Sequence, residues 1–175
     1  RRGAGTEAPY AVGVHQDHGL TADEYQHNVA AFAGPETGRR WRERFQQEDV
    51  DAFITLDFWR TTNMPEPLEH MPLAVCDPTS IEVADIVPTA FEGIAPGGAV
   101  THHVGLRFNA GQRWYYYPRM RPDEVLVFKI FHLEAREGPQ RYRACFHSAV
   151  ADPSTPENAQ PRQSCEHRVG VMLLK

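Results

Sequence analysis

The chain has 175 residues, of which 41% are hydrophobic and 23% are charged, and these values suit a single globular domain with a sizeable core. Its formal net charge of −5 argues against nucleic acid as a partner. No apolar run approaches the roughly 18 residues that a transmembrane helix needs, so we expect no membrane partner either. We therefore expect one domain over residues 1–175.

The three cysteines, Cys76, Cys145 and Cys165, are an odd number and show no short CxxC spacing. This pattern argues against a disulfide scaffold or a zinc knuckle and indicates a reducing compartment, so we expect a cytoplasmic protein. Residues 1–5 are not followed by the apolar stretch of a signal peptide. Because position 1 is not a methionine, we expect the N-terminal part of the protein to be truncated here.

The first elements along the chain are a short strand and two helices. Residues 10–17 are mostly small or apolar and predict a strand. Thr21 and Glu24 have the spacing of a capping box, which predicts a helix over 22–33. A second helix is predicted over 36–48.

From residue 51 onward the chain has the pattern of many short strands separated by Gly, Pro, Asn and Asp. Such spacing is typical of a β-sandwich or barrel, so the predicted fold class is mainly β. We interpret residues 151–161 as a surface connection between two adjacent strands. The strand-like segments are 51–59, 72–76, 81–87, 100–108, 113–117, 124–131, 142–150 and 164–174.

His15 and Asp17 form an HxD triplet at the end of the first predicted strand. A strand sends residues i and i+2 to the same face, so an imidazole and a carboxylate can converge there on one ion. Sites with two histidines and one carboxylate leave the opposite face of the metal open and are usual in Fe(II) oxygenases. The triplet alone is a weak signal, because a surface pair at a strand end has the same sequence.

A second histidine, His147, lies in the late strand-like segment 142–150. Closure of a barrel can bring it to the triplet, although a core histidine bonded to backbone is the alternative. His102 and His103 are less suitable, because adjacent strand residues point to opposite faces. His15, Asp17 and His147 are therefore the candidate metal ligands.

Arg162 and Ser164 come at the start of the last predicted strand. A guanidinium there can hold a carboxylate through two hydrogen bonds, and that carboxylate would be the far end of a 2-oxoacid that chelates the metal. Arg168 competes for this role, because alternate residues from 162 to 168 share one strand face. The position after His147 favours Arg162, so we expect Arg168 to pair with an acidic residue such as Glu166 or Asp85.

Three consecutive tyrosines, at 115–117, alternate across the predicted sheet, so at least one of them should point into the barrel. We name Tyr116 as a candidate hydrogen-bond partner of the oxoacid, with core packing as the alternative. The segment 18–49 leaves the metal-bearing strand directly. We expect it to lie beside the mouth of the site and to act as a lid, although arginines at 39–44 that alternate with aromatic residues are also typical of a solvated helix face.

The order HxD, His, RxS is the order of the 2-oxoglutarate-dependent oxygenases. At a finer level, about residues 14–175 resemble a group of oxygenases from natural-product pathways. That group includes the cephamycin 7α-methoxylation partner protein and gibberellin-desaturase-like hydroxylase/desaturases. The segments that carry the resemblance, in order, are 14–17 (VHQD), 57–60 (DFWR), 72–80 (PLAVCDPTS), 113–118 (RWYYYP), 120–129 (MRPDEVLVFK), 146–153 (FHSAVADP) and 161–168 (PRQSCEHR).

The resemblance implies a double-stranded β-helix (a cupin-like jelly roll) with residues 22–48 as a helical insertion. It implies Fe(II), with 2-oxoglutarate as co-substrate, and hydroxylation or desaturation of a small natural-product or amino-acid-derived substrate. The residues implied at the co-substrate are Arg162, Ser164, Arg168 and Tyr116. Two alternatives stay open: a cupin-like metalloenzyme that uses no oxoacid, and a non-catalytic subunit of a biosynthetic partner enzyme. A homodimer is also open.

Overall fold

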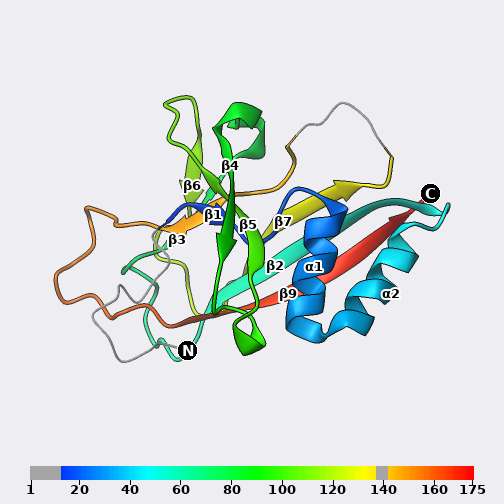
Figure 1. The fold of residues 1–175 in the computed structure, drawn as a ribbon. Helices are drawn as coiled ribbons and strands as arrows, with labels where there is room; N and C mark the ends of the chain where they lie inside the picture. Colours follow the sequence, from blue (N-terminus) through cyan, green and yellow to red (C-terminus); the bar gives the residue numbers. More distant parts are fainter. Residues whose placement is uncertain (1–12, 137–141) are drawn as a thin grey trace.

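The computed structural model describes residues 13–136 and 142–175, and it consists mainly of two antiparallel β-sheets (Figure 1). The strands of the larger sheet are β1 (His15–Gln16), β3 (Leu73–Cys76), β4 (Ile86–Phe91), β5 (Thr101–Leu106), β6 (Trp114–Tyr116) and β8 (His147–Ala149). The strands of the smaller sheet are β2 (Val50–Thr61), β7 (Leu126–Glu134) and β9 (Ser164–Leu174). The orders are β4-β5-β1-β8-β3-β6 and β7-β2-β9.

The predicted mainly-β pattern is confirmed, with several local differences. Residues 10–12 of the strand predicted over 10–17 lie outside the described residues, and the strand itself covers only His15–Gln16; the strand predicted over 142–150 covers only His147–Ala149. Residues Val83–Asp85 form a 3₁₀ turn, and the strand predicted over 81–87 begins only at Ile86. The segment 151–161 follows β8 and leads to β9, which belong to different sheets. It therefore crosses from one sheet to the other and does not join adjacent strands as predicted.

The two helices form where the sequence predicts them, as α1 (Ala22–Ala33) and α2 (Pro35–Phe45). The capping box is present: the backbone N–H of Glu24 donates to Thr21 Oγ1 at 3.2 Å, and the backbone N–H of Thr21 donates to Glu24 Oε2 at 3.0 Å. These bonds satisfy N–H groups that a helix N-terminus otherwise leaves without partners. In the described part of the chain, no helix has the length and apolar composition needed to cross a membrane.

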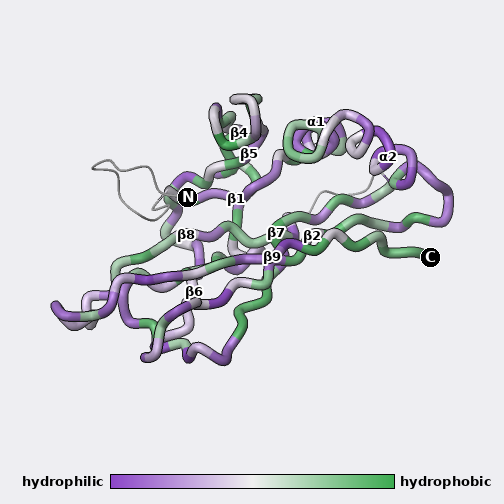
Figure 2. The backbone as a smooth tube through the Cα atoms, turned by 90° about the horizontal axis from the view of Figure 1, so that it is seen from below, coloured by the Kyte–Doolittle hydropathy of each residue, from purple (hydrophilic) through white to green (hydrophobic). Residues whose placement is uncertain are grey.

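The central strand of the smaller sheet, β2, turns alternate side chains toward the larger sheet. The inward residues are buried, as alternation on a half-covered sheet requires. Those residues are Phe53, Thr55, Asp57, Trp59 and Thr61. In Figure 2, which colours the chain by residue hydropathy, much of β2 is green (hydrophobic), whereas most of α2 is purple (hydrophilic). One position of this inner face, Asp57, thus carries a carboxylate within an otherwise uncharged row.

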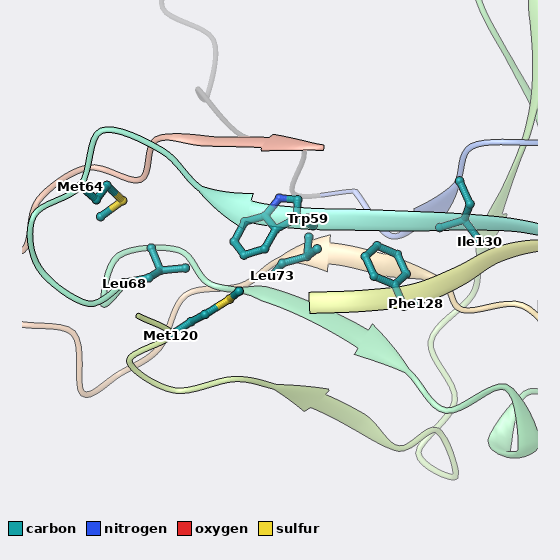
Figure 3. Close-up of a cluster of buried hydrophobic side chains, with 7 residues drawn as sticks. All are labelled: Trp59, Met64, Leu68, Leu73, Met120, Phe128 and Ile130. Atoms are coloured by element: carbon teal, nitrogen blue, oxygen red, sulfur yellow. The ribbon is translucent and has the colours of Figure 1, made fainter. Parts of the chain in front are cut away.

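Two clusters of buried side chains fill the space beside β2. One lies between the two sheets and includes Trp59, Leu73, Phe128 and Ile130 (Figure 3). Full burial of each such side chain stabilises the fold by about 1.5–3 kcal/mol. The other cluster lies under the helices and consists of Tyr25, Phe45, Val50, Phe53 and Phe131. The site described below lies next to the first cluster.

The helices belong to this second cluster and do not cover the mouth of the site. The ring of Tyr25 lies 4.8 Å from the ring of Phe131 and 4.9 Å from that of Phe53, between centroids. No residue of 18–49, all of which the structure describes, lines the pocket that contains His15. The prediction that this segment is a lid is wrong, because Tyr25 and Phe45 are buried in the core at the other half of β2.

Asn28 fixes α1 to β5. Its side-chain amide donates to the carbonyl of His102 at 2.6 Å, and its Oδ1 accepts from the N–H of His102 at 2.8 Å. Asn28 is 2% exposed. The strand β1 has only two residues and pairs with β5 at Val104 and Gly105. At His102 the Asn28 side chain thus makes the two backbone hydrogen bonds that a longer neighbouring strand would make.

Replacing Asn28 with alanine should lower the free energy of unfolding by about 2 kcal/mol or more, because it leaves two buried backbone groups without partners. Urea denaturation followed by circular dichroism measures this change. The matched control is Gln26→Ala in the same helix, which should cost at most about 0.5 kcal/mol. Equal losses in the two variants would show that the contact with β5 does not hold the helix.

Candidate metal centre

The register of the larger sheet places His15 directly opposite His147, on the neighbouring strands β1 and β8. The two imidazole rings lie 4.5 Å apart between centroids. Asp17 follows two residues after His15 and turns to the same side: its Oδ1 is 3.5 Å from His15 Nε2, and its Oδ2 is 3.6 Å from His147 Nε2. The structure therefore brings together all three predicted ligands, with one donor atom of each within 4.8 Å of the others.

The protonation states of these side chains suit metal ligands, which must carry free lone pairs. Nδ1 of His15 lies 2.7 Å from the carbonyl oxygen of Gly13, so it carries the proton and leaves Nε2 free. Burial lowers the pKa of His147 to about 4, so its imidazole is neutral. Burial alone would raise the pKa of Asp17, but His147, Arg168 and His15 together hold that pKa below its ordinary value.

The three residues line a pocket of about 350 Å³ between the two sheets, here called the central pocket. Its walls come from β2, β3, β8 and β9 and from the segment before β9. Besides the triad it is lined by Trp59, Leu73, Ser148, Ala149, Arg162, Ser164, Cys165, Glu166 and Arg168. A concave site with a few convergent polar groups is where a small molecule binds.

Arg162 contributes a buried cation to the central pocket. It is 8% exposed, its Nη1 donates to the carbonyl of Met71 at 2.6 Å, and its guanidinium carbon lies 5.5 Å from the centre of the Trp59 ring. Arg162 lies before β9, which begins at Ser164. Arg162 is thus outside the strand as predicted, but Arg162, Ser164 and Arg168 line the same pocket.

Arg168 lies on β9 and binds three carboxylates. Its Nη2 donates to Asp17 Oδ2 at 2.7 Å, its Nε donates to Asp57 Oδ1 at 3.2 Å, and it also pairs with Glu166. The predicted pairing with Glu166 is confirmed. The alternative with Asp85 is wrong, because that carboxylate accepts a hydrogen bond from Asn109.

Asp57 is the site residue that sequence reasoning missed. Its side chain has no exposed surface. Burial raises its pKa above the ordinary value, Arg168 opposes this rise, and Glu166 and Asp17 add to it. The sequence contained a signal for it, since Asp57 is an acidic residue at an inward position of an apolar strand. Carboxylates of Asp17, Asp57 and Glu166 also cluster within 4.8 Å, but the guanidinium of Arg168 already supplies the cation between them.

Tyr116 lies away from the central pocket. The register places it opposite Ala74, which in turn lies opposite Ser148, whereas Tyr115 shares a row with Val75 and His147. Tyr116 is 42% exposed, and its hydroxyl donates to Asp152 Oδ2 at 2.9 Å. All three tyrosines are largely exposed, and none of them lines the central pocket, because β6 is the edge strand of the larger sheet.

The remaining histidines and cysteines that the sequence raised do not join the triad. His103 is buried and bonds to Thr101 at 2.8 Å, whereas the ring of His102 packs against His27. The prediction that adjacent His102 and His103 face opposite ways is confirmed. All three cysteines are free thiols.

Comparison with known proteins places the chain among oxidoreductases. A family model described as "Oxidoreductase/YMDC permease-like domain" matches residues 2–172. The Fe(II)/2-oxoglutarate-dependent dioxygenase nvfI of Aspergillus novofumigatus is 30% identical over 156 residues, which are 89% of this chain and 50% of that protein. The hydroxylase/desaturase asaB of Aspergillus flavus is 30% identical over 130 residues, which are 66% of this chain and 56% of asaB.

Solved structures give the same result. The iron and alpha-ketoglutarate-dependent endoperoxidase NvfI, in a structure titled "with different conformation", superposes with a TM-score of 0.72 at 25% identity, over 100% of this chain and 58% of that one. A second structure of NvfI gives a TM-score of 0.69 at 26% identity, over 98% and 57% of the two chains. The chain spans about half the length of the curated relatives it matches. On the match over residues 2–172, the chain belongs to the family of the oxidoreductase/YMDC permease-like domain.

Proposed function

We propose that the chain is the metal-binding domain of an Fe(II)/2-oxoglutarate-dependent oxygenase, with His15, Asp17 and His147 as the iron ligands. The observation that carries the proposal is the direct pairing of His15 with His147 in the sheet, with Asp17 beside both rings. We infer that the metal is iron and that the co-substrate is 2-oxoglutarate from the relatives, which are named as enzymes that depend on both.

The donor set fits Fe(II). Two imidazole nitrogens and one carboxylate oxygen converge from one side and leave the other side open toward the central pocket, which is the arrangement of non-heme Fe(II) oxygenases. Bound there, iron together with 2-oxoglutarate and dioxygen would oxidise a C–H bond of the substrate. The chain's own residues orient the ligands: the carbonyl of Gly13 fixes the tautomer of His15.

We assign the distal carboxylate of 2-oxoglutarate to Arg162, with Ser164 as a second hydrogen-bond donor. Both residues line the central pocket together with the triad. The Trp59 ring and the carbonyl of Met71 hold the Arg162 guanidinium in place, and a fixed guanidinium binds a carboxylate with little further loss of entropy. Arg168 is the weaker candidate, because its donors already bind Asp17, Asp57 and Glu166.

Several finer features are part of the same proposal. We infer that the two sheets are those of a double-stranded β-helix, that residues 1–175 form one domain, and that 22–48 is an insertion in it. We further propose that the chain is related to the cephamycin 7α-methoxylation partner protein and to the gibberellin-desaturase-like hydroxylase/desaturases. Its reaction would be the hydroxylation or desaturation of a small natural-product substrate. The cytoplasmic location and the homodimer or partner enzyme remain predictions from the sequence.

Succinate formation tests the proposed function. The purified protein with Fe(II), dioxygen and 2-oxoglutarate should release succinate, and the Asp17→Asn variant, which keeps the shape of the side chain, should release none above background. Asp77→Asn is the matched control, since Asp77 pairs with Arg113 on an exposed part of the surface. Absence of succinate from protein that binds iron but not 2-oxoglutarate would favour the oxoacid-independent alternative.

A further inference from the structure

We propose that Asp57 and Arg168 form a positioning pair that holds Asp17 by one oxygen, so that Asp17 offers only its other oxygen to a metal. The inference rests on the proposed function, since it concerns the same three ligands. The proposed function gives these two charged residues no role: Arg168 lines the central pocket and Asp57 adjoins it, but neither binds the metal or anchors the oxoacid there.

The guanidinium of Arg168 bridges the two sheets. Arg168 on β9 lies directly opposite Asp57 on β2 in the strand register, and its Nε donates to Asp57 Oδ1 at 3.2 Å. From there its Nη2 reaches across to Asp17 Oδ2 at 2.7 Å. A planar fork with fixed donor directions can hold both carboxylates at once, which a single ammonium group cannot do in the same geometry.

Asp57 stands where the fold would otherwise favour an apolar residue. It has no exposed surface, and its Oδ2 has no hydrogen-bond partner among the described residues. A buried carboxylate destabilises a fold unless it is paired. The one ion pair shown for Asp57 is with Arg168, so its contribution is to fix the guanidinium.

The contact leaves the two oxygens of Asp17 in different situations. Oδ2 accepts a hydrogen bond from Arg168 Nη2 at 2.7 Å and also lies 3.6 Å from Nε2 of His147, whereas Oδ1 lies 3.5 Å from Nε2 of His15. A carboxylate that binds through one oxygen completes a three-ligand face and leaves three positions of an octahedral ion open. These positions would be needed for an oxoacid, which chelates through two oxygens, and for dioxygen. A carboxylate that bound through both oxygens would fill one of them, and the hydrogen bond of Arg168 to Oδ2 would oppose this.

The experiment compares metal affinity in variants that keep charge or shape. Arg168→Lys keeps the positive charge but loses the fork, and Asp57→Asn keeps the shape but loses the charge. Isothermal titration with Co(II), a stand-in for Fe(II) that is stable in air, should show about 10-fold weaker binding in each, as loss of an outer partner of a metal ligand typically does. Because Asp57 acts through Arg168, the double variant should bind no more weakly than Arg168→Lys alone.

A second readout and a matched control accompany the titration. The visible spectrum of bound Co(II) reports its coordination and should change in both variants, which a merely structural role would not cause. The control is the exposed pair Arg113 and Asp77, in which the guanidinium also donates through Nε and Nη2, at 3.2 and 2.7 Å. Arg113→Lys and Asp77→Asn should leave both affinity and spectrum unchanged.

Unchanged affinity and spectrum in Arg168→Lys and Asp57→Asn would overturn the inference while leaving the proposed function intact. Tighter Co(II) binding in Arg168→Lys would also overturn it, because the guanidinium would then compete with the metal for Asp17. If the wild-type protein binds no Co(II), or binds it equally well after His15→Ala, the proposed function itself fails, and the positioning pair fails with it.

Discussion

Replacing His147 with alanine is expected to lower the affinity for Fe(II) or Co(II) by more than about 100-fold, beyond the largest effect usual for an outer partner of a metal ligand. The His147 imidazole is 5% exposed and lies beside His15 and Asp17. Its loss removes one of the two nitrogen donors. The remaining two ligands, His15 and Asp17, hold a metal ion much more weakly than three ligands do. Isothermal titration of the metal-free protein measures the change.

A histidine on the neighbouring sheet provides the control for this variant. His167 on β9 is exposed and does not line the central pocket, so His167→Ala should bind metal like the wild type. Asp17→Asn provides a second ligand variant of unchanged size, in case the cavity left by His147→Ala destabilises the core. Wild-type affinity in both ligand variants would remove the triad as the metal site.

Arg162→Ala should weaken 2-oxoglutarate binding by about 30-fold or more, because loss of one partner of a buried charge pair costs about 2–5 kcal/mol. Metal binding should change little, since Arg162 is not one of the three proposed ligands. Titrating 2-oxoglutarate into the anaerobic Fe(II) protein measures the effect. Arg162→Lys, which keeps the charge but loses the fork, should fall between the wild type and the alanine variant.

The same titration separates the two arginines. In Arg168→Ala, measured at saturating metal, the affinity for 2-oxoglutarate should fall less than in Arg162→Ala, because Arg168 is engaged with Asp17, Asp57 and Glu166. Unchanged affinity in Arg162→Ala together with a large loss in Arg168→Ala would transfer the anchoring role. No loss in either variant would favour the oxoacid-independent metalloenzyme.

Local rules were enough to predict much of the fold and two of the three candidate ligands. The capping box at Thr21 places the start of α1, because it depends on residues only three apart. The spacing of His15 and Asp17 places both on one strand face, because strand alternation is also local. The prediction that His147 joins them depended on the resemblance to known oxygenases, since no local rule pairs residues 132 positions apart, from 15 to 147.

The errors come from strand position within the sheet and from tertiary packing. Tyr116 is exposed because β6 is the edge strand of its sheet, and periodicity alone does not fix the position of a strand within a sheet. The segment 18–49 packs on the core and not over the site, because Tyr25 and Phe45 have aromatic partners on β2 and β7, which are far away in sequence. The pairing of Asp57 with Arg168 spans two strands that meet only in the folded sheet.

The most direct test of the central claim is metal analysis combined with an anaerobic titration of 2-oxoglutarate, followed by visible absorption. We expect one Fe(II) per chain, and a new visible band when 2-oxoglutarate binds to the iron. That band should be absent in His147→Ala and Asp17→Asn and should persist in His167→Ala. An iron stoichiometry and a band that survive unchanged in both ligand variants would contradict the claim that His15, Asp17 and His147 hold the metal.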